Sequence, residues 1–347
     1  MAGITGKQLV LQAFNLQETE RVPAVIFGGG MWIMRDSGNT FEGLIGKPEA
    51  MAEMVIRANE KIQSDMVFVG SGYNNVHARC LGGKIKFRPV GAPDLEEPIV
   101  NGPEDLERLD LDRLRDDEVI NTIWRATELV HRAVGEEVLV TATAWGPFSL
   151  AAQLYGVERL MHSIFKNRGM VTACLEFATE MLLKFYEPMI KGGYLGAVSL
   201  ADATASGDLI SRKQFAEFAV PYLRKFTDRV KEWGGTTFLH ICGDTNNRLD
   251  LFPETGAACI ALDSKVDLAL AKATIGGRMC VAGNVNPVVV LERGTPGQVE
   301  EAAAECIHKA GRGGGFVLLP GCDIPPTVPL ENIRAFIGTT RKVRPAN

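Results

Sequence analysis

The stretch Thr236-Thr-Phe-Leu-His-Ile-Cys-Gly-Asp244 joins an apolar run to two side chains that can bind a metal. The apolar run predicts a buried strand, and the Gly-Asp pair that follows it favours a turn. Side chains alternate between the two faces of a strand, so His240 and Cys242 are expected to project in the same direction. The sequence therefore predicts an imidazole and a thiol side by side where a strand ends.

The same arrangement of an apolar run followed by a helical pattern repeats along the chain. The expected strands begin near residues 22, 66, 138, 197, 236, 258, 278 and 315. Strands that alternate with helices pair in parallel through right-handed crossovers. Eight such units predict an α/β fold, a (β/α)8 or TIM barrel.

The helical patterns are less evenly spaced than the strands. They cover residues 5–16, 48–62, 119–134, 148–155, 168–191, 211–233, 266–275, 295–310 and 329–341. Gly28-Gly29-Gly30 predicts a loop, because the spaced glycine pattern of dinucleotide-binding proteins is absent. Residues 72–117 are rich in Gly and Pro and predict an irregular insertion over the barrel. We expect residues 1–347 to form one domain.

Composition limits the functions that the chain can have. It has 347 residues, 46% hydrophobic and 23% charged, with a net charge of −5 and no block of Lys or Arg. Neither a nucleic-acid partner nor a membrane span is expected, and the N-terminus lacks the pattern of an export signal. The seven cysteines form no compact framework, so free thiols or ligands in the cytoplasm are expected.

A third candidate ligand, Cys322, follows the last expected strand, 80 residues after Cys242 (322 − 242). Active sites of TIM barrels lie at the C-terminal ends of the strands, where the fold would bring Cys322 to His240 and Cys242. One imidazole and two thiolates suit a catalytic zinc ion that keeps one position open for substrate. A zinc site rich in thiolate is better suited to activating a thiol than to activating water.

Other polar and aromatic side chains are expected near the same end of the barrel. Asp202, Asp263 and Asn284 follow the fourth, sixth and seventh strands. Asp202 is a candidate for proton transfer or substrate orientation, and Asn284 for substrate orientation, although a structural role stays open for both. Asp263, Trp145 and Tyr73 are further candidates for contact with substrate, with core packing as the alternative for Trp145.

Three segments resemble the methylcobamide:coenzyme M methyltransferases, a group within the uroporphyrinogen decarboxylase superfamily. They are Leu239-His-Ile-Cys-Gly-Asp244, Val281-Ala-Gly-Asn-Val-Asn-Pro287 and Leu319-Pro-Gly-Cys-Asp-Ile-Pro-Pro-Thr-Val-Pro-Leu-Glu-Asn332. Glu18-Thr-Glu-Arg-Val-Pro23 and Ser199-Leu-Ala-Asp202 extend the similarity over the whole chain. The His-x-Cys…Cys trio is the specific part, and in that family it binds zinc.

The resemblance implies a zinc-dependent methyltransferase that moves a methyl group between a corrinoid, such as methylcobalamin, and a zinc-activated thiol like coenzyme M. The chain has no Asp-x-His-x-x-Gly signature for cobalamin. A separate corrinoid protein is therefore expected to dock at the barrel mouth, and a small thiol or methylated compound to be the other substrate.

Three alternatives stay open. The same zinc could act on the donor side, in a demethylase or dehalogenase that transfers methyl from a methylated substrate to cob(I)alamin. A uroporphyrinogen decarboxylase-type enzyme is disfavoured, because Phe27–Arg35 offers one arginine to a tetra-anionic substrate. The third alternative is a barrel that binds a tetrapyrrole without catalysis.

Overall fold

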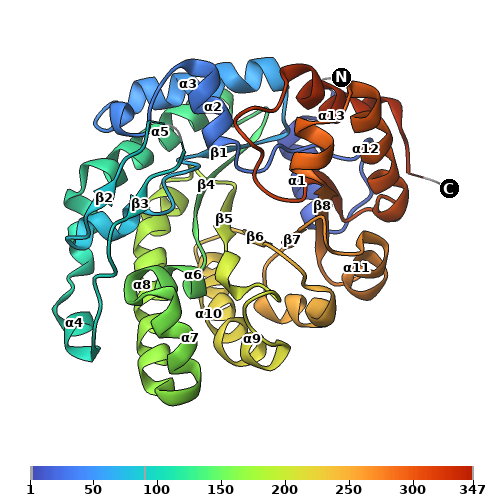
Figure 1. Cartoon of the computed structure of the whole chain (residues 1–347). Helices are drawn as coiled ribbons and strands as arrows, with labels where there is room; N and C mark the ends of the chain where they lie inside the picture. The colour runs from blue at the N-terminus through green and yellow to red at the C-terminus, as the bar shows by residue number, and fades with distance from the viewer. Residues whose placement is uncertain (1–2, 90, 346–347) are drawn as a thin grey trace.

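The computed structural model describes residues 3–89 and 91–345, and at its centre seven parallel strands form a curled sheet. The strands, in their spatial order, are β1 (Met66–Val69), β4 (Leu139–Trp145), β5 (Ala197–Ala201), β6 (Thr237–Ile241), β7 (Cys259–Leu262), β8 (Cys280–Val285) and β9 (Phe316–Pro320). Figure 1 shows this sheet inside a ring of helices. The TIM-barrel prediction is confirmed.

The first expected strand is reduced to a single bridge that closes the barrel between β9 and β1. Ala24 pairs in parallel with Leu318, and the Val25 amide donates to the Leu318 carbonyl at 3.0 Å. On the other side, the Asp65 amide donates to the Ala24 carbonyl at 3.0 Å. The segment 22–27 therefore occupies the place of a strand without forming a continuous ladder.

Helices surround the sheet, most of them on its outer face (Figure 1). They are α1 (Gly6–Phe14), α2 (Gly30–Ser37), α3 (Pro48–Ile62), α4 (Pro103–Arg108), α5 (Glu118–Val134), α6 (Pro147–Tyr155), α7 (Val157–Lys166), α8 (Arg168–Lys191), α9 (Arg212–Phe218), α10 (Val220–Glu232), α11 (Leu268–Ile275), α12 (Pro296–Ala310) and α13 (Leu330–Lys342). None of those within the described residues is long and apolar enough to span a bilayer.

The structure corrects the expected helices at three places. The loop predicted at Gly28-Gly29-Gly30 gives way at Gly30 to α2, a helix that the sequence did not predict. Helix α7 was not predicted either. The single helix predicted over 211–233 is divided into α9 and α10 at Ala219. Pro221 lies at the start of α10, where its missing N–H is tolerated, whereas it could not continue the ladder of α9.

The strands bury both of their faces, in two separate clusters. Residues that face the ring of helices, such as Leu239 and Ile241, belong to the larger cluster. Residues that point into the barrel, such as Phe238, pack with Phe14 of α1, and these two rings lie 6.2 Å apart. Because the Lys7 amide of α1 donates to Glu137, just before β4, α1 fills the end where the strands begin. The opposite end, where the strands finish, remains open for a functional site.

The segment between β1 and α5 is irregular and lies to one side of the barrel (Figure 1). It contains α4 and a short antiparallel hairpin of β2 (Ile85–Lys86) and β3 (Asp94–Leu95). Asn75 connects this hairpin to the barrel, because its amide donates to the Pro93 carbonyl at 2.6 Å and its oxygen accepts from the Trp145 indole at 2.6 Å. The hairpin is thereby fixed relative to the end of β4.

Candidate metal centre

His240, Cys242 and Cys322 come together at the C-terminal ends of β6 and β9. His240 Nε2 lies 3.1 Å from Cys242 Sγ, and Cys242 Sγ lies 3.7 Å from Cys322 Sγ. One donor atom from each of the three lies within 4.8 Å of the other two. Within the described parts of the chain, no other group of His, Cys, Asp or Glu side chains was found with this spacing.

The spacing of the donor atoms fits a tetrahedral zinc ion. With Zn–S bonds of about 2.3 Å, two thiolates in a tetrahedral site lie roughly 3.8 Å apart, close to the 3.7 Å between Cys242 and Cys322. The 3.1 Å between His240 and Cys242 would have to open by roughly 0.5 Å, since Zn–N bonds are about 2.0–2.1 Å. Three protein ligands leave one coordination position for another molecule.

The surroundings of His240 hold its ring in the orientation that a metal ligand needs. Its side chain is 1% exposed, and Nδ1 lies 3.1 Å from the Ala261 carbonyl. A carbonyl only accepts, so Nδ1 carries the hydrogen and Nε2 keeps its lone pair for a metal. The Phe27 ring packs against the imidazole with a centroid distance of 4.5 Å and limits its rotation.

The pKa values of Cys242 and Cys322 are shifted in opposite directions. The hydrogen bond with Cys242 lowers the pKa of Cys322, against the effect of its burial. The same hydrogen bond to Cys322, together with burial and the carboxylates of Asp263 and Asp323, raises the pKa of Cys242. Thiolates are the form of cysteine that binds metals, so binding of a metal by this pair would displace protons.

Asp263 and Asn284 support the turns at the ends of β6 and β7. Asp263 Oδ2 accepts a hydrogen bond from the Gly243 amide at 2.9 Å. Asn284 Nδ2 donates to the carbonyls of Asp263 and Val266 at 2.9 and 2.8 Å. Asp263 thus lies near the candidate metal ligands, Asn284 holds the backbone of the turn after β7, and contact of either side chain with substrate stays a prediction.

Asp202 is fully buried beneath the same end of the barrel. Its two carboxylate oxygens accept from the amides of Ser149 and Phe148, at 2.7 and 3.3 Å, at the N-terminus of α6. Its own amide donates to the His240 carbonyl at 2.8 Å, and burial raises the pKa of Asp202 to about 6. These contacts make Asp202 a positioning residue for β6 and α6, and its role in proton transfer stays a prediction.

The polar atoms of Trp145 and Tyr73 are occupied by contacts within the protein. Trp145 donates to Asn75, as described above, and the Tyr73 hydroxyl donates to the Phe41 carbonyl at 2.5 Å. Tyr73 is only 1% exposed, which favours packing over substrate contact, while Trp145 keeps part of its ring exposed. Neither side chain is brought to the three ligands by a hydrogen bond.

Two neighbours of the site were not found from the sequence. Asp323 Oδ1 accepts from the Gly29 amide at 2.6 Å, and burial and the Cys322 thiolate raise the pKa of Asp323 to about 7. A Cβ at Gly28, whose φ is +62°, would lie 2.7 Å from Asp323 Oδ1, so the glycine permits this close approach. Two features of the sequence could have indicated them: Asp323 directly follows Cys322, and Phe27 is the last residue of the first apolar run.

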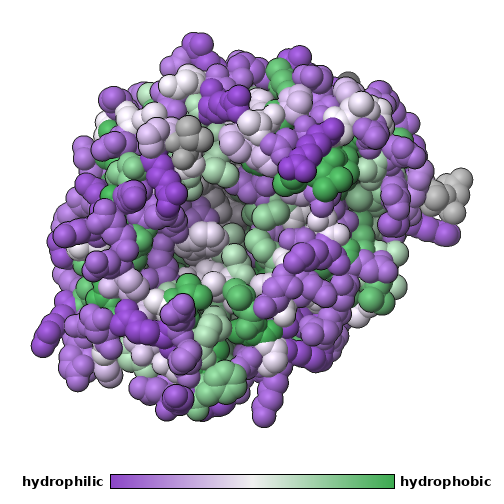
Figure 2. All heavy atoms as spheres, viewed as in Figure 1, coloured by the Kyte–Doolittle hydropathy of each residue, from purple (hydrophilic) through white to green (hydrophobic). Residues whose placement is uncertain are grey.

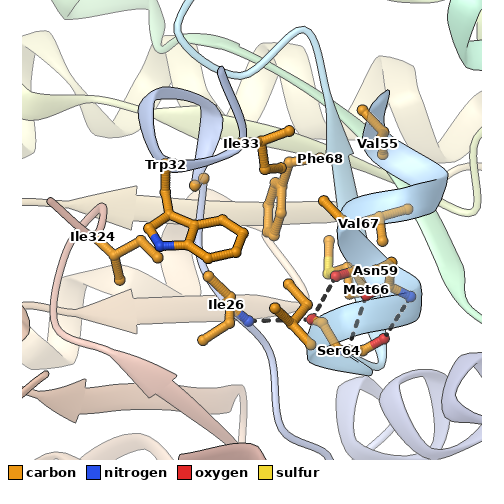
Figure 3. Close-up of a pocket in the computed structure, with 14 residues that line it drawn as sticks. Ile26, Trp32, Ile33, Val55, Asn59, Ser64, Met66, Val67, Phe68 and Ile324 are labelled. Carbon is orange, nitrogen blue, oxygen red and sulfur yellow. Dashed lines mark hydrogen bonds between the residues drawn. The ribbon is translucent and has the colours of Figure 1, made fainter. Parts of the chain in front are cut away.

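A narrow apolar pocket lies where the segment 22–27 and β1 separate (Figure 3). Trp32, Ile33, Ile324 and Phe68 project into it from different elements, and its polar groups come from Asn59 and Ser64. The Ser64 hydroxyl accepts from the Ile26 amide at 3.2 Å in place of a strand partner. With no charged side chain in its lining, this pocket is not equipped to bind an ionic ligand.

The fold and the cluster together define a class of protein, a TIM barrel with a His/Cys/Cys cluster that could hold a metal ion at the C-terminal ends of its strands. The sequence model of the uroporphyrinogen decarboxylase (URO-D) family matches residues 5–343. The chain belongs to the uroporphyrinogen decarboxylase family.

Within the family, the chain is similar to methyltransferases of Methanosarcina species. It is 31% identical to the methylcobamide:CoM methyltransferase MtbA of Methanosarcina mazei, over 99% of this chain and 100% of that protein. It is 29% identical to the methylcobamide:CoM methyltransferase MtaA of Methanosarcina barkeri, over 97% and 98% of the two chains. A solved methyltransferase from Methanosarcina mazei superposes with a TM-score of 0.87 at 26% identity, covering 98% and 99%. The resemblance drawn from the sequence is confirmed.

Proposed function

We propose that this protein is a zinc-dependent methyltransferase that moves a methyl group between a corrinoid and a small thiol of the coenzyme M type. The observation that carries the proposal is the His240–Cys242–Cys322 cluster at the barrel mouth. The similarity to methylcobamide:CoM methyltransferases over nearly the full chain supports the same activity.

The side chains of the site divide the work between holding the metal and orienting its ligands. Cys242 and Cys322 would bind as thiolates and His240 through Nε2, which leaves one position for the substrate sulfur. When bound there, zinc lowers the pKa of a thiol, so that the thiolate is present at neutral pH. Phe27 and the surrounding buried strands exclude water from the protein side of the cluster.

In this proposal a separate corrinoid protein presents the methyl group at the mouth of the barrel. The substrate sulfur gains the methyl group and loses its proton to solvent. The corrinoid keeps the electron pair of the broken carbon–cobalt bond. The product is a thioether, and the protein itself gains and loses no atoms or electrons.

The experiment that tests the function uses zinc-loaded protein and free methylcobalamin. Addition of 2-mercaptoethanesulfonate should convert the methylcobalamin spectrum and yield the methyl thioether, whereas omission of the thiol should leave the spectrum unchanged. Absence of any thiol-dependent reaction, together with methylation of cob(I)alamin by a methylated substrate, would instead assign the protein to the donor side. Absence of both reactions would favour a barrel that binds a tetrapyrrole without catalysis.

A further inference from the structure

Arg248 is a cation buried close to the turn that follows Cys242. Figure 2 shows one face of the molecule, and hydrophilic side chains cover most of it. Arg248 differs from most charged residues because it is 0% exposed, and it is the largest of the fully buried side chains in the described parts of the chain. Burying a guanidinium is costly unless its N–H groups and its charge are satisfied within the protein. The partners of Arg248 therefore indicate what it holds in place.

The guanidinium of Arg248 binds the backbone of the loop of residues 203–210 that follows β5 (the β5 loop). Nη2 donates to the Ile210 carbonyl at 2.7 Å, and Nη1 donates to the Ala205 carbonyl at 3.3 Å. The Phe215 ring of α9 lies 5.2 Å from the guanidinium carbon, within the range of a cation–π contact. The side chain thus ties two points of the β5 loop to the segment that follows β6.

The β5 loop packs directly on the turn that follows Cys242. A Cβ added to Gly207 would overlap the Asp244 carbonyl oxygen, so the two backbones are in contact there. A Cβ on Gly243, whose φ is +77°, would overlap the Ser206 hydroxyl oxygen. Glycine on each side of the contact permits this close approach. The position of the β5 loop therefore limits where the backbone immediately after Cys242 can lie.

An exposed ion pair attaches the same loop to the turn after β7. Lys265 pairs with Asp208 of the β5 loop at 2.8 Å, and both side chains are about half exposed, so the pair contributes little by itself. Burial lowers the pKa of Arg248, and the nearby carboxylates of Asp244 and Asp208 act against this. Arg248 is the stronger attachment of the β5 loop, because its hydrogen bonds are shielded from water.

We propose that Arg248 is a positioning residue for the candidate metal ligand Cys242 and that it acts through the β5 loop. Its bonds to the two loop carbonyls hold the loop against Asp244, and this contact fixes the backbone two residues after the cysteine. Asp263 holds the same turn through the amide that directly follows Cys242. Together these contacts present the Cys242 sulfur in one orientation. The inference rests on the proposed function, because it assumes that a metal binds at the cluster.

The test compares Arg248→Met with a variant of a neighbouring arginine that touches the same segment. Arg212 is about half exposed, pairs with Asp250 and donates to the Asn247 carbonyl at 2.8 Å, so Arg212→Met is a matched control. In the cobalt(II)-loaded full chain, Arg248→Met should change the ligand-field and thiolate-to-cobalt absorption bands. It should also bind Zn²⁺ about 10- to 100-fold more weakly, whereas Arg212→Met should keep the wild-type spectrum and affinity. If Arg248 only stabilised the fold, Arg248→Met would unfold more easily but its folded fraction would keep the wild-type spectrum.

A second variant tests the same contact without changing Arg248. Gly207→Ala forces the β5 loop away from the Asp244 carbonyl and should alter the cobalt spectrum in the same way. Gly338→Ala is its control, because a Cβ added there would meet no atom within 4 Å. Gly207→Ala therefore still tests the inference if Arg248→Met does not fold.

Amide hydrogen exchange separates this inference from the proposed function. It is measured by mass spectrometry on the metal-free full chain, in overlapping peptides that contain Gly243, whose amide binds Asp263. Exchange of this amide should be faster in Arg248→Met and Gly207→Ala than in the wild type and the two controls. If the wild type methylates no thiol, the proposed function fails while this comparison still tests the role of Arg248. Wild-type exchange at Gly243 in both variants would overturn the inference, as would a wild-type cobalt spectrum in both.

Discussion

At the scale of single residues, the geometry of Cys242 depends on a carboxylate that touches no metal. Asp263 Oδ2 binds the Gly243 amide at 2.9 Å, and Oδ1 binds the Lys265 amide at 3.0 Å. The carboxylate thus connects the turn after β6 to the turn after β7. Groups that orient metal ligands in this way commonly affect metal affinity as well as structure.

Replacing Asp263 should therefore weaken metal binding without removing a ligand. We expect Asp263→Ala to reduce zinc affinity by about 10- to 100-fold, because the Gly243 amide loses its acceptor and the Cys242 turn is less ordered. Competition with a chromophoric zinc chelator measures this affinity directly. Asp263→Asn keeps an acceptor and should lose less. Equal zinc affinity in the wild type and Asp263→Ala would show that the turn holds without the carboxylate.

The candidate metal ligands could be predicted from strand alternation and barrel topology. The alternation of side chains in a strand places His240 and Cys242 together, and barrel topology brings Cys322 to them. Phe27 and Asp323 could not be predicted in the same way, because their contacts depend on how the segments pack against one another and not only on which strand end they follow. Such contacts depend on how far each strand is shifted relative to its neighbour, which no local pattern encodes.

At the scale of elements, the insertion between β1 and α5 contains a histidine that is buried in its neutral form. His77 is 1% exposed, its Nδ1 lies 3.1 Å from the Asn74 carbonyl, and its ring packs edge-on against Phe185 of α8. Burial lowers the pKa of His77 to about 4. His77 therefore binds a proton less readily in the folded protein than in the unfolded chain, where its pKa has the ordinary value of about 6.5.

This burial predicts a loss of stability in mild acid. The contribution of neutral His77 is fully present above pH 6.5 and is lost as the pH falls towards 4, since protonation then favours the unfolded chain. Between pH 7 and 4.5, the wild type should lose about 2–3 kcal/mol of unfolding free energy more than His77→Phe does. Urea unfolding of both proteins at the two pH values measures the difference. Parallel losses in the two proteins would refute this explanation.

Predictions of elements failed where a long pattern contained a local interruption. The apolar periodicity of 211–233 continues through Pro221, so the sequence indicates one helix, but the helix is interrupted at Ala219, whose φ is −108°. The segment 22–27 has the composition of a strand, yet Asp65 and Ser64 take its amide hydrogen bonds with their side chains. Here side-chain oxygens replace the backbone carbonyls of a strand ladder as acceptors. This depends on tertiary contacts and cannot be predicted from the periodicity of the sequence.

At the scale of the whole molecule, one carboxylate closes the barrel. Asp65 is 5% exposed and forms a two-point ion pair with Arg21, with both N···O distances at 2.7 Å. One of its oxygens also accepts from the Ala24 amide at 2.8 Å. The segment 22–27 is therefore attached at the start of β1 by this side chain and the Ser64 hydroxyl, together with the single backbone bond from Asp65 to Ala24.

Removal of the Asp65 carboxylate should destabilise the entire barrel. We expect Asp65→Ala to lower the free energy of unfolding by about 3 kcal/mol, because the buried Ala24 amide and Arg21 both lose their partner. Chemical denaturation followed by far-UV circular dichroism measures the change. Exposed Asp228→Ala, which breaks an ion pair with Arg224 on one helix, should cost less than about 1 kcal/mol. Similar losses in both variants would contradict this role for Asp65.

The central claim is that two neighbouring side chains, His240 and Cys242, and one 80 residues further along the chain, Cys322, bind one zinc ion at the mouth of the barrel. Its most direct test is elemental analysis of purified wild type, Cys322→Ser and the control Cys306→Ser, which alters a buried thiol of α12 outside the cluster. We predict stoichiometric zinc in the wild type and the control, and a large loss of zinc in Cys322→Ser. Zinc content in Cys322→Ser equal to that of the wild type would contradict the account.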